Sequence, residues 1–156
     1  MGQMTDRATV RRWLAAYEAA WRAPGTDRLA DIFTEDASYR QSPYTDPVVG
    51  LAAIGQMWDT EREGPDEVFC LAADIVAVDG PTAVVRVEVG YGDPVRQEYR
   101  DLWLLRLGND GRCRWFRGVA VLARAVPRRP VGAYGPVIIG HQVSARRESG
   151  CGASVT

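Results

Sequence analysis

The spacing of apolar residues changes once along the chain, near residue 65, and this change limits the class of fold. Over residues 5–22, apolar side chains recur at steps of three and four, which predicts an amphipathic helix. A short second helix ending at Phe33 and a third helix over residues 51–63 are expected to follow. Beyond residue 65 the period falls to two, which is typical of strands.

Five strands are expected, one before the third helix and four after it. They cover about residues 37–41, 67–78, 82–91, 95–107 and 112–125. Asp, Asn, Gly and Pro residues mark the short turns between the last four strands, which predicts antiparallel pairing. The sequence therefore predicts an α+β domain with three helices packed on one face of a bent antiparallel sheet.

Length and composition agree with one domain followed by a tail. The chain has 156 residues and 46% of them are hydrophobic, which is enough to bury a single core. From residue 127 to residue 156 the composition shifts to Gly, Pro, Arg and Ser, with one short apolar run at residues 137–139. We expect residues 127–156 to form a mobile C-terminal extension.

Charge and cysteine usage restrict the expected partners and compartment. The formal net charge is −1 and both signs are distributed along the length, so neither a nucleic acid nor a membrane surface is an expected partner. The sequence contains no signal-like stretch and no apolar run long enough to span a membrane. Three cysteines without metal-ligand spacing predict free thiols, and we expect a cytoplasmic protein.

The scarcity of histidine and lysine excludes several kinds of catalysis. The only histidine is His141, in the expected extension, and all 19 residues counted as Lys or Arg are Arg. Ser-His-Asp and Cys-His nucleophile systems and histidine metal sites need an imidazole, and Schiff-base chemistry needs a lysine. The sequence therefore predicts no metal site and no nucleophile of these kinds.

One carboxylate falls on the apolar face of the expected sheet. Tyr99, Asp101 and Trp103 alternate with other residues of their strand, so they share the face that meets the helices. A lone carboxylate there is costly unless it is hydrogen-bonded, paired or exposed to a water-filled pocket, and desolvation raises its pKa. Asp101 is either a general acid or base, or a structural residue that pairs with an arginine or a backbone group.

The opposite face of the same strands carries charge. Arg86, Glu88, Glu98 and Arg100 share it, and opposite charges fit a register that pairs Arg86 with Glu98 and Glu88 with Arg96. We expect this outer face to meet its counterpart in a homodimer, because two-fold interfaces use the same patch on both copies.

Aromatic side chains from helices and strands are directed at one interior. They are Trp13, Tyr17, Tyr39, Trp58, Tyr99 and Trp103. Aromatic residues at such spacing usually form a core, but Tyr and Trp also carry polar tips that need partners. Small-molecule sites are typically apolar pockets with a few placed polar groups. The set is therefore either a core or the wall of a ligand pocket.

Three segments resemble those of SnoaL-like proteins in the nuclear transport factor 2-like superfamily. They are Phe33-Thr34-Glu35-Asp36-Ala37-Ser38-Tyr39, Pro47-Val48-Val49-Gly50 leading into Ile54 and Trp58, and Tyr99-Arg100-Asp101-Leu102-Trp103 followed by Asp110-Gly111-Arg112-Cys113. The resemblance implies a cone-shaped fold and a SnoaL-like domain over residues 5–126. It implies no single activity, because the superfamily mixes isomerases, dehydratases, cyclases, epoxide hydrolases and non-catalytic binding domains.

Ketosteroid isomerases of the same superfamily offer a comparison for the site. Their general-base aspartate corresponds to Gln41 here, and two of their tyrosines correspond to Trp13 and Trp58. Their strand acid corresponds to Trp103, with Asp101 one pleat away on the same face. Because Gln41 cannot take a proton, the resemblance argues against steroid isomerisation.

Two functions follow from the residues and the resemblance, and neither requires a cofactor. In the first, the domain binds a small apolar or polyketide-like molecule in the aromatic-lined pocket without catalysis. The ligand-binding residues would be Trp13, Tyr17, Gln41, Trp58 and Trp103. In the second, the protein is a cofactor-independent lyase, isomerase or hydrolase in which Asp101 is the general acid or base, and Tyr99 and Tyr39 position the substrate or donate hydrogen bonds to it.

The sequence departs from the family after Phe116. SnoaL-like chains with a similar Tyr-Arg-Asp-Leu-Trp strand are expected to continue as Glu-Glu-Trp-Pro-Phe-Trp-Pro-Gly, a segment that is absent here. One set of synonymous codons for residues 117–125, read one base later, encodes that segment. We hypothesise a one-base insertion after the Phe116 codon, the alternative being a subfamily with its own C-terminus. A coding sequence that cannot be aligned in the shifted frame would exclude the insertion.

Overall fold

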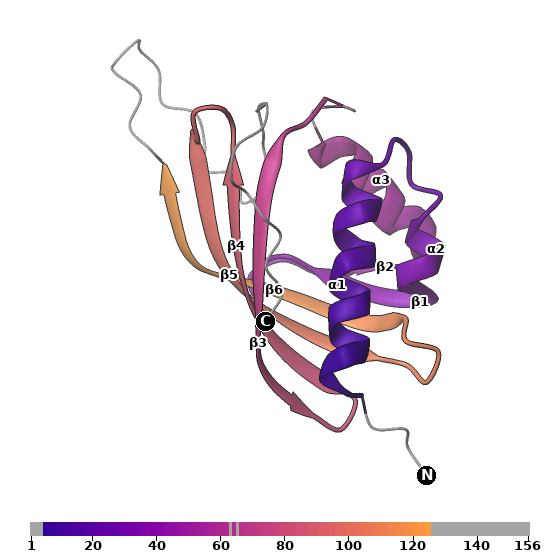
Figure 1. The fold of residues 1–156 in the computed structure, drawn as a ribbon. Helices are drawn as coiled ribbons and strands as arrows, with labels where there is room; N and C mark the ends of the chain where they lie inside the picture. The colour runs from indigo at the N-terminus through magenta and orange to yellow at the C-terminus, as the bar shows by residue number, and fades with distance from the viewer. Residues whose placement is uncertain (1–4, 63, 65, 126–156) are drawn as a thin grey trace.

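Three helices lie on one side of a curved sheet (Figure 1). The computed structural model describes residues 5–62, 64 and 66–125, with side chains described as far as residue 119. The expected extension over residues 127–156, including His141, lies outside these residues. The predicted α+β class is confirmed.

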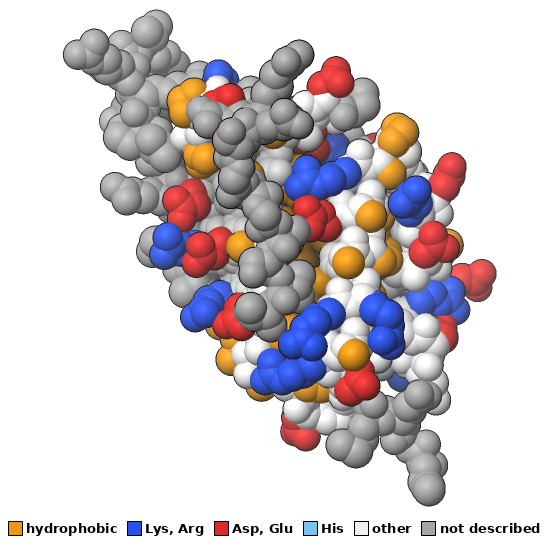
Figure 2. Space-filling model, viewed as in Figure 1, with side chains coloured by type: hydrophobic (Ala, Val, Ile, Leu, Met, Phe, Trp, Pro, Cys, Tyr) orange, Lys and Arg blue, Asp and Glu red, His pale blue; other side chains and the backbone are white. Residues whose placement is uncertain are grey.

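Helix α1 (Arg7–Arg22) is the amphipathic helix that the sequence predicts. Asp6 is the N-cap, and its side chain accepts a hydrogen bond from the Thr9 amide at 2.7 Å. Its buried residues recur at the expected helical spacing and are Val10, Trp13, Leu14, Tyr17, Ala20 and Trp21. The exposed side carries arginines, and Figure 2 shows basic side chains along this helix.

The other two helices are shorter than predicted. Helix α2 (Leu29–Ile32) is a single turn, and the chain is already extended at Phe33, the first residue of strand β1. Helix α3 (Leu51–Glu61) buries Ile54 and Trp58. None of the helices in the described part of the chain is long and apolar enough to cross a membrane.

The sheet contains six strands in the order β2-β1-β6-β5-β4-β3. The strands are β1 (Phe33–Arg40), β2 (Val48–Val49), β3 (Phe69–Asp79), β4 (Thr82–Tyr91), β5 (Gln97–Leu107) and β6 (Cys113–Ala125). Strands β3 to β6 form the expected antiparallel meander, since short turns reverse the chain between them. Four of the five expected strands lie close to their predicted bounds, and β1 begins four residues earlier than predicted.

The prediction of a wholly antiparallel sheet is wrong, because β1 pairs with β6 in parallel. No hairpin joins these two strands, so their relative direction is set by the long connection through α3 and the meander. The pattern of apolar residues contains no information about that direction. The sequence also failed to indicate β2, which pairs with β1 but is too short to show a period.

The predicted register of β4 on β5 is also wrong. Glu88 lies opposite Arg100 rather than Arg96, and the same displacement separates Arg86 from its predicted partner Glu98. The turn between β4 and β5, residues 92–96, contains more residues than the predicted register allows. The division into two faces is nevertheless confirmed, since an even displacement leaves every side chain on its predicted side.

The outer face forms different ion pairs from those predicted. Arg86 contacts Asp74 of β3 at 2.8 Å, and Arg100 contacts Glu98 of its own strand at 2.9 Å. All four side chains are at least one-third exposed, so each pair contributes little to stability.

Phe116 of β6 lies at the centre of an aromatic core. Its ring stacks on Tyr39 at 4.3 Å between ring centres and on Tyr17 at 6.1 Å. It also contacts Trp103 at 5.2 Å and Trp13 at 6.3 Å. Through this ring, α1 is packed against β1, β5 and β6 at once.

The expectation of three free thiols is wrong, since it fails at Cys70. Cys113 is a free, buried thiol, and burial raises its pKa to about 12. Cys70 is disulfide-bonded. Sequence spacing could not reveal this, because disulfide pairing depends on which residues the fold brings together.

We expect Phe116→Ala to lower the free energy of unfolding by about 3–5 kcal/mol, because it removes a buried ring and leaves a cavity. Urea denaturation with an unchanged m-value measures the loss. Tyr44→Ala is the control, since Tyr44 is 95% exposed and its removal should change stability by less than about 0.5 kcal/mol. Equal effects of the two substitutions would contradict the central position of Phe116.

Candidate functional site

Asp101 is buried on the inner face of β5, as the strand pattern predicts. It is 8% exposed and lies opposite Val87 of β4. A β-bulge in the pairing with β6 begins at this residue, and bulges commonly redirect a side chain near a functional site. Trp103 Nε1 donates to Asp101 Oδ2 at 3.4 Å, while Oδ1 accepts no hydrogen bond from any described residue.

Burial raises the pKa of Asp101 above its ordinary value, and the Trp103 hydrogen bond opposes this in part. No described arginine pairs with the carboxylate. Of the two predicted alternatives, the structural one that requires an arginine partner is therefore not what the described residues form. A buried carboxyl that is hard to ionise can donate a hydrogen bond, which an ionised one cannot.

Tyr17 of α1 and Tyr39 of β1 join helix and sheet through their hydroxyl groups. The two oxygen atoms are 3.1 Å apart in a buried contact. Burial raises the pKa of both phenols, and the charge of Glu61 adds to this effect. Both hydroxyls therefore remain protonated and can act as hydrogen-bond donors through the neutral pH range.

Gln41 extends this polar group towards α3. Its Nε2 atom donates to Glu61 Oε2 at 2.7 Å. Burial raises the pKa of Glu61, although Gln41 lowers it in part. The Tyr17–Tyr39 and Gln41–Glu61 pairs are close enough for the charge of Glu61 to raise the pKa of Tyr39, and Glu61 is a second carboxyl that burial makes hard to ionise.

The sequence did not identify Glu61 as a site residue. The spacing of buried residues along α3 nevertheless predicts the position of Glu61. Ile54, Trp58 and Glu61 follow at steps of four and three, which places Glu61 on the buried side of α3. The charged neighbours along the chain obscured this position.

The predicted tryptophans surround Tyr17. Its ring centre lies 4.9 Å from that of Trp103, and 5.2 Å from those of Trp58 and Trp13. Trp58 is fully buried, and its Nε1 atom has no hydrogen-bond partner among the described residues. The predicted convergence of these rings is therefore what the structure shows.

Tyr99 lies at the edge of this cluster. Gln97 Nε2 donates to its hydroxyl, and its ring contacts Tyr91 with 5.8 Å between centres. Burial raises its pKa, and the charge of Asp101 contributes. Tyr99 thus shares the inner face with Asp101 but contacts β4 rather than Tyr17.

The rings leave little space between them. The cavity lined by Tyr17, Trp21, Phe69, Leu71, Val89, Tyr91 and Trp103 has a volume of about 10 Å³. This is room for about one water molecule. The described residues therefore form a close-packed core with unpaired polar atoms, and a larger ligand would require side chains to move.

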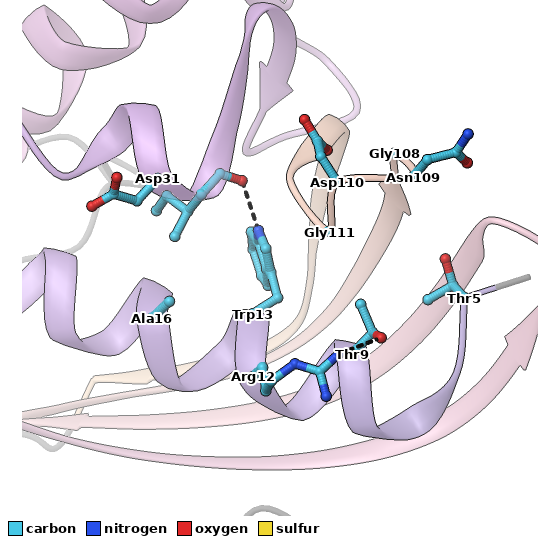
Figure 3. A pocket seen from close by; sticks show the side chains of 11 residues that line it. Thr5, Thr9, Arg12, Trp13, Ala16, Asp31, Gly108, Asn109, Asp110 and Gly111 are labelled. Atoms are coloured by element: carbon cyan, nitrogen blue, oxygen red, sulfur yellow. Dashed lines mark hydrogen bonds between the residues drawn. The ribbon is translucent and has the colours of Figure 1, made fainter. Parts of the chain in front are cut away.

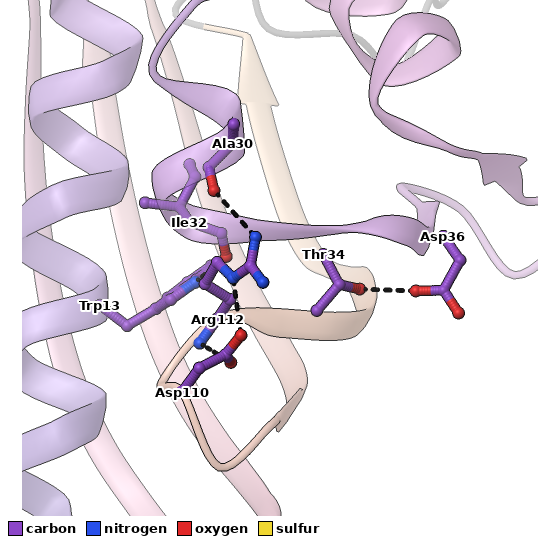
Figure 4. Close-up of polar contacts among 7 residues, drawn as sticks. All are labelled: Trp13, Ala30, Ile32, Thr34, Asp36, Asp110 and Arg112. Carbon is purple, nitrogen blue, oxygen red and sulfur yellow. Dashed lines mark hydrogen bonds and ion pairs between the residues drawn. The ribbon is translucent and has the colours of Figure 1, made fainter.

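A roomier pocket of about 310 Å³ lies elsewhere, between α1, α2 and the turn that joins β5 to β6 (Figure 3). Of the predicted site residues it includes only Trp13, whose Nε1 atom donates to the Ile32 carbonyl at 2.8 Å. Asp110 and Arg112 pair at 2.7 Å beside it (Figure 4). Two of its lining donors already have protein partners, Trp13 and Arg12, which donates to Thr9 Oγ1 at 2.8 Å. The interior cluster around Asp101 contains most of the predicted site residues and is taken as the candidate site.

The family profile of the SnoaL-like domain matches residues 10–124, which extends past Phe116. No match was found among curated proteins. Within residues 5–62, 64 and 66–125, no group of three His, Cys, Asp or Glu side chains could hold a metal ion.

Three solved structures share the fold. The epoxide hydrolase/cyclase-like enzyme SalBIII, which acts in pyran ring formation in the polyether salinomycin, has a TM-score of 0.60 and 16% identity, covering 74% of this chain and 92% of its own. An NTF-2 like protein of unknown function from Burkholderia xenovorans LB400 has a TM-score of 0.55 and 16% identity. The match covers 80% of this chain and 89% of that protein's chain. A ketosteroid isomerase-like protein from Erwinia carotovora atroseptica SCRI1043 has a TM-score of 0.53 and 17% identity. The match covers 74% of this chain and 95% of that protein's chain. These identities show the nuclear transport factor 2-like fold alone.

The raised pKa of Asp101 predicts how stability depends on pH. The folded protein binds this proton more tightly than the unfolded chain, so stability is lost as pH rises from about 3.9 through the folded-state pKa. Asp101→Asn removes this loss. We expect the unfolding free energy of the variant to fall less steeply than that of the wild type between about pH 4 and pH 7, measured by urea denaturation.

Asp110→Asn is the matched control, because hydrogen bonds from Arg112 lower the pKa of Asp110. Its contribution is present above the unfolded pKa and is lost as pH falls, so this variant should differ from the wild type in the opposite direction. If the unfolding free energies of Asp101→Asn and the wild type changed in parallel with pH while Asp110→Asn behaved as expected, the raised pKa of Asp101 would be contradicted.

Proposed function

Because the chain belongs to the SnoaL-like domain family, we propose that it binds a small, mainly apolar molecule between α1 and the inner face of the sheet. One observation carries the proposal, namely the buried Oδ1 atom of Asp101 that has no partner among the described residues. Buried polar atoms in folded proteins nearly always have a partner. A hydroxyl or carbonyl oxygen of a ligand would supply one.

The side chains around Asp101 suit a flat ligand with one polar end. Tyr17 and Trp103 line the interior cavity and offer aromatic faces. The unpaired Nε1 atom of Trp58 is a second donor for a ligand oxygen. The raised pKa of Asp101 extends its protonated, hydrogen-bond-donating form to higher pH.

Ligand entry requires rearrangement, because the cavity holds only about one water molecule. Tyr17 and Trp103 line this cavity and are in contact, so rotation of these two rings is the simplest way to enlarge it. Rotation of Tyr17 breaks its hydrogen bond to Tyr39 and frees two hydroxyls for the ligand.

Cofactor-independent catalysis as a lyase, isomerase or hydrolase is a second candidate function. The raised pKa of Asp101 favours it, since a general acid or base works best when its pKa lies near the working pH. Asp101 would protonate a departing oxygen or remove a proton from carbon. Tyr39 and Tyr99 would stay protonated and stabilise a developing oxyanion, because burial raises the pKa of both. The likeness in fold to SalBIII supports this chemistry only by analogy.

We expect Asp101→Leu to weaken ligand binding about tenfold or more, because it removes a buried hydrogen bond and leaves shape nearly unchanged. Native mass spectrometry of the purified protein identifies any retained molecule, and 2-naphthol, an aromatic alcohol, serves as the probe otherwise. Calorimetric titration gives the Kd of each variant. Asp46→Leu is the control, since Asp46 is exposed. A Kd for Asp101→Leu equal to that of the wild type would overturn the proposed site.

Asp101→Asn separates binding from catalysis. The amide still donates a hydrogen bond but cannot transfer a proton, so binding should stay within about threefold of the wild type while any conversion of the ligand stops. Incubation of the retained molecule with each protein, followed by mass analysis, measures conversion. Conversion by the Asn variant at the wild-type rate would exclude Asp101 as the acid or base.

We also propose a homodimer through the outer face of the sheet. Half-buried Leu102 and Leu104 lie there beside the predicted charged residues, with Arg86 opposite Leu102, Glu88 opposite Arg100 and Glu98 paired with Arg100. Apolar centres with charged rims are typical of protein interfaces, and a two-fold axis would pair each patch with its copy.

We expect light scattering to give the mass of a dimer at micromolar concentration, and Leu102→Glu with Leu104→Glu to give a monomer because buried like charges repel. Arg11→Glu, on the exposed side of α1, is the control and should stay dimeric. A wild-type monomer, or a dimer in the double variant, would contradict this interface.

A further inference from the structure

Three arginines from three adjacent strands meet on the outer face of the sheet. Arg40 of β1 lies opposite Arg117 of β6 in the parallel pair. Trp115 precedes Arg117 on the same face and lies opposite Arg106 of β5. The guanidinium carbons of Arg106 and Arg117 lie 4.7 Å and 4.4 Å from the centre of the Trp115 ring. One indole thus contacts two cations.

Arg117 is fixed in place by protein oxygens. Its Nη1 atom donates to the carbonyls of Ser38 at 3.0 Å and Phe116 at 2.7 Å, and its Nη2 atom donates to Ser38 Oγ at 3.0 Å. These acceptors are neutral, so they orient the charge without compensating it. The Arg40–Arg106–Arg117 cluster is therefore built around an immobilised cation.

No carboxylate of the described residues balances the charges of the cluster. Among residues 5–62, 64 and 66–125, none of the three arginines forms an ion pair. Burial lowers the pKa of Arg117, and the charges of Arg40 and Arg106 lower it further. Arg40 and Arg106 therefore each repel the charge of Arg117.

Other arginines of the same sheet face have acidic partners. Arg86 pairs with Asp74, and Arg100 pairs with Glu98. Contact with an indole offsets only part of the repulsion among neighbouring cations, about 0.5–1 kcal/mol at exposed sites. Guanidinium groups bind oxyanions through paired N–H donors, and this is the usual reason for their gathering.

We propose that the Arg40–Arg106–Arg117 cluster binds a phosphate-type oxyanion, either free or carried by a small molecule, on the face of the sheet opposite the interior site. Arg40 and Arg106 supply the N–H donors, since the Nη atoms of Arg117 already donate to Ser38 and Phe116. Arg117 supplies fixed positive charge, and Trp115 holds Arg106 and Arg117 in place. The site is independent of ligand binding at Asp101.

Inorganic phosphate is the probe, titrated by calorimetry at constant ionic strength in chloride. The wild type should bind it, and the double variant Arg40→Gln with Arg106→Gln should lose at least about tenfold in affinity. The control Arg86→Gln with Arg100→Gln removes the same charge from the same face and should bind phosphate like the wild type. Loss of affinity in the control equal to that in the cluster variant would mean non-specific attraction and would overturn the proposal.

Thermal unfolding without phosphate gives a second readout. Arg40→Gln relieves repulsion, so its Tm at low salt should exceed that of the wild type, whereas Arg86→Gln breaks an ion pair and should not raise Tm. A wild type that binds no phosphate overturns the proposal. Light scattering then tests one alternative. If the variant Arg40→Gln with Arg106→Gln is a monomer while the control Arg86→Gln with Arg100→Gln stays dimeric, the cluster binds carboxylates of a second copy instead of phosphate.

Discussion

The packing of Tyr17 on the inner face of the sheet is the contact on which the rest of the structure depends. Its ring reaches Trp103 of β5 and Trp58 of α3, while its hydroxyl meets that of Tyr39 on β1. One side chain of α1 thus contacts the sheet at two points and a second helix at a third. Because aromatic rings bury large areas and also orient one another, this contact fixes how the helix lies across the curved sheet.

The same packing creates the chemistry of the interior. Two carboxyls, Asp101 and Glu61, lie close enough to the Tyr17–Tyr39 pair for their charges to raise the pKa of Tyr39, and burial makes both hard to ionise. Neither has an arginine to restore its charge among the described residues. Apolar surroundings therefore produce weak acids and protonated phenols, which suits recognition of a neutral molecule with an oxygen atom better than recognition of an ion.

The two faces of the sheet carry opposite electrostatic character. On the inner face, burial raises the pKa of Asp101. On the outer face, Arg117 of the Arg40–Arg106–Arg117 cluster is partly buried beside two like charges, and both effects lower its pKa. Strand alternation separates these environments by the thickness of one sheet, so β5 supplies Asp101 to one side and Arg106 to the other.

The sequence by itself determined the helix of residues 7–22, the four-strand meander and the inner position of Asp101, because local periodicity decides which side of an element is buried. Only the tertiary structure decided the parallel pairing of β1 with β6, the register of β4 on β5 and the link between Gln41 and Glu61. These depend on contacts between residues distant in sequence. A period specifies a face, but it contains no information about which neighbour that face will meet.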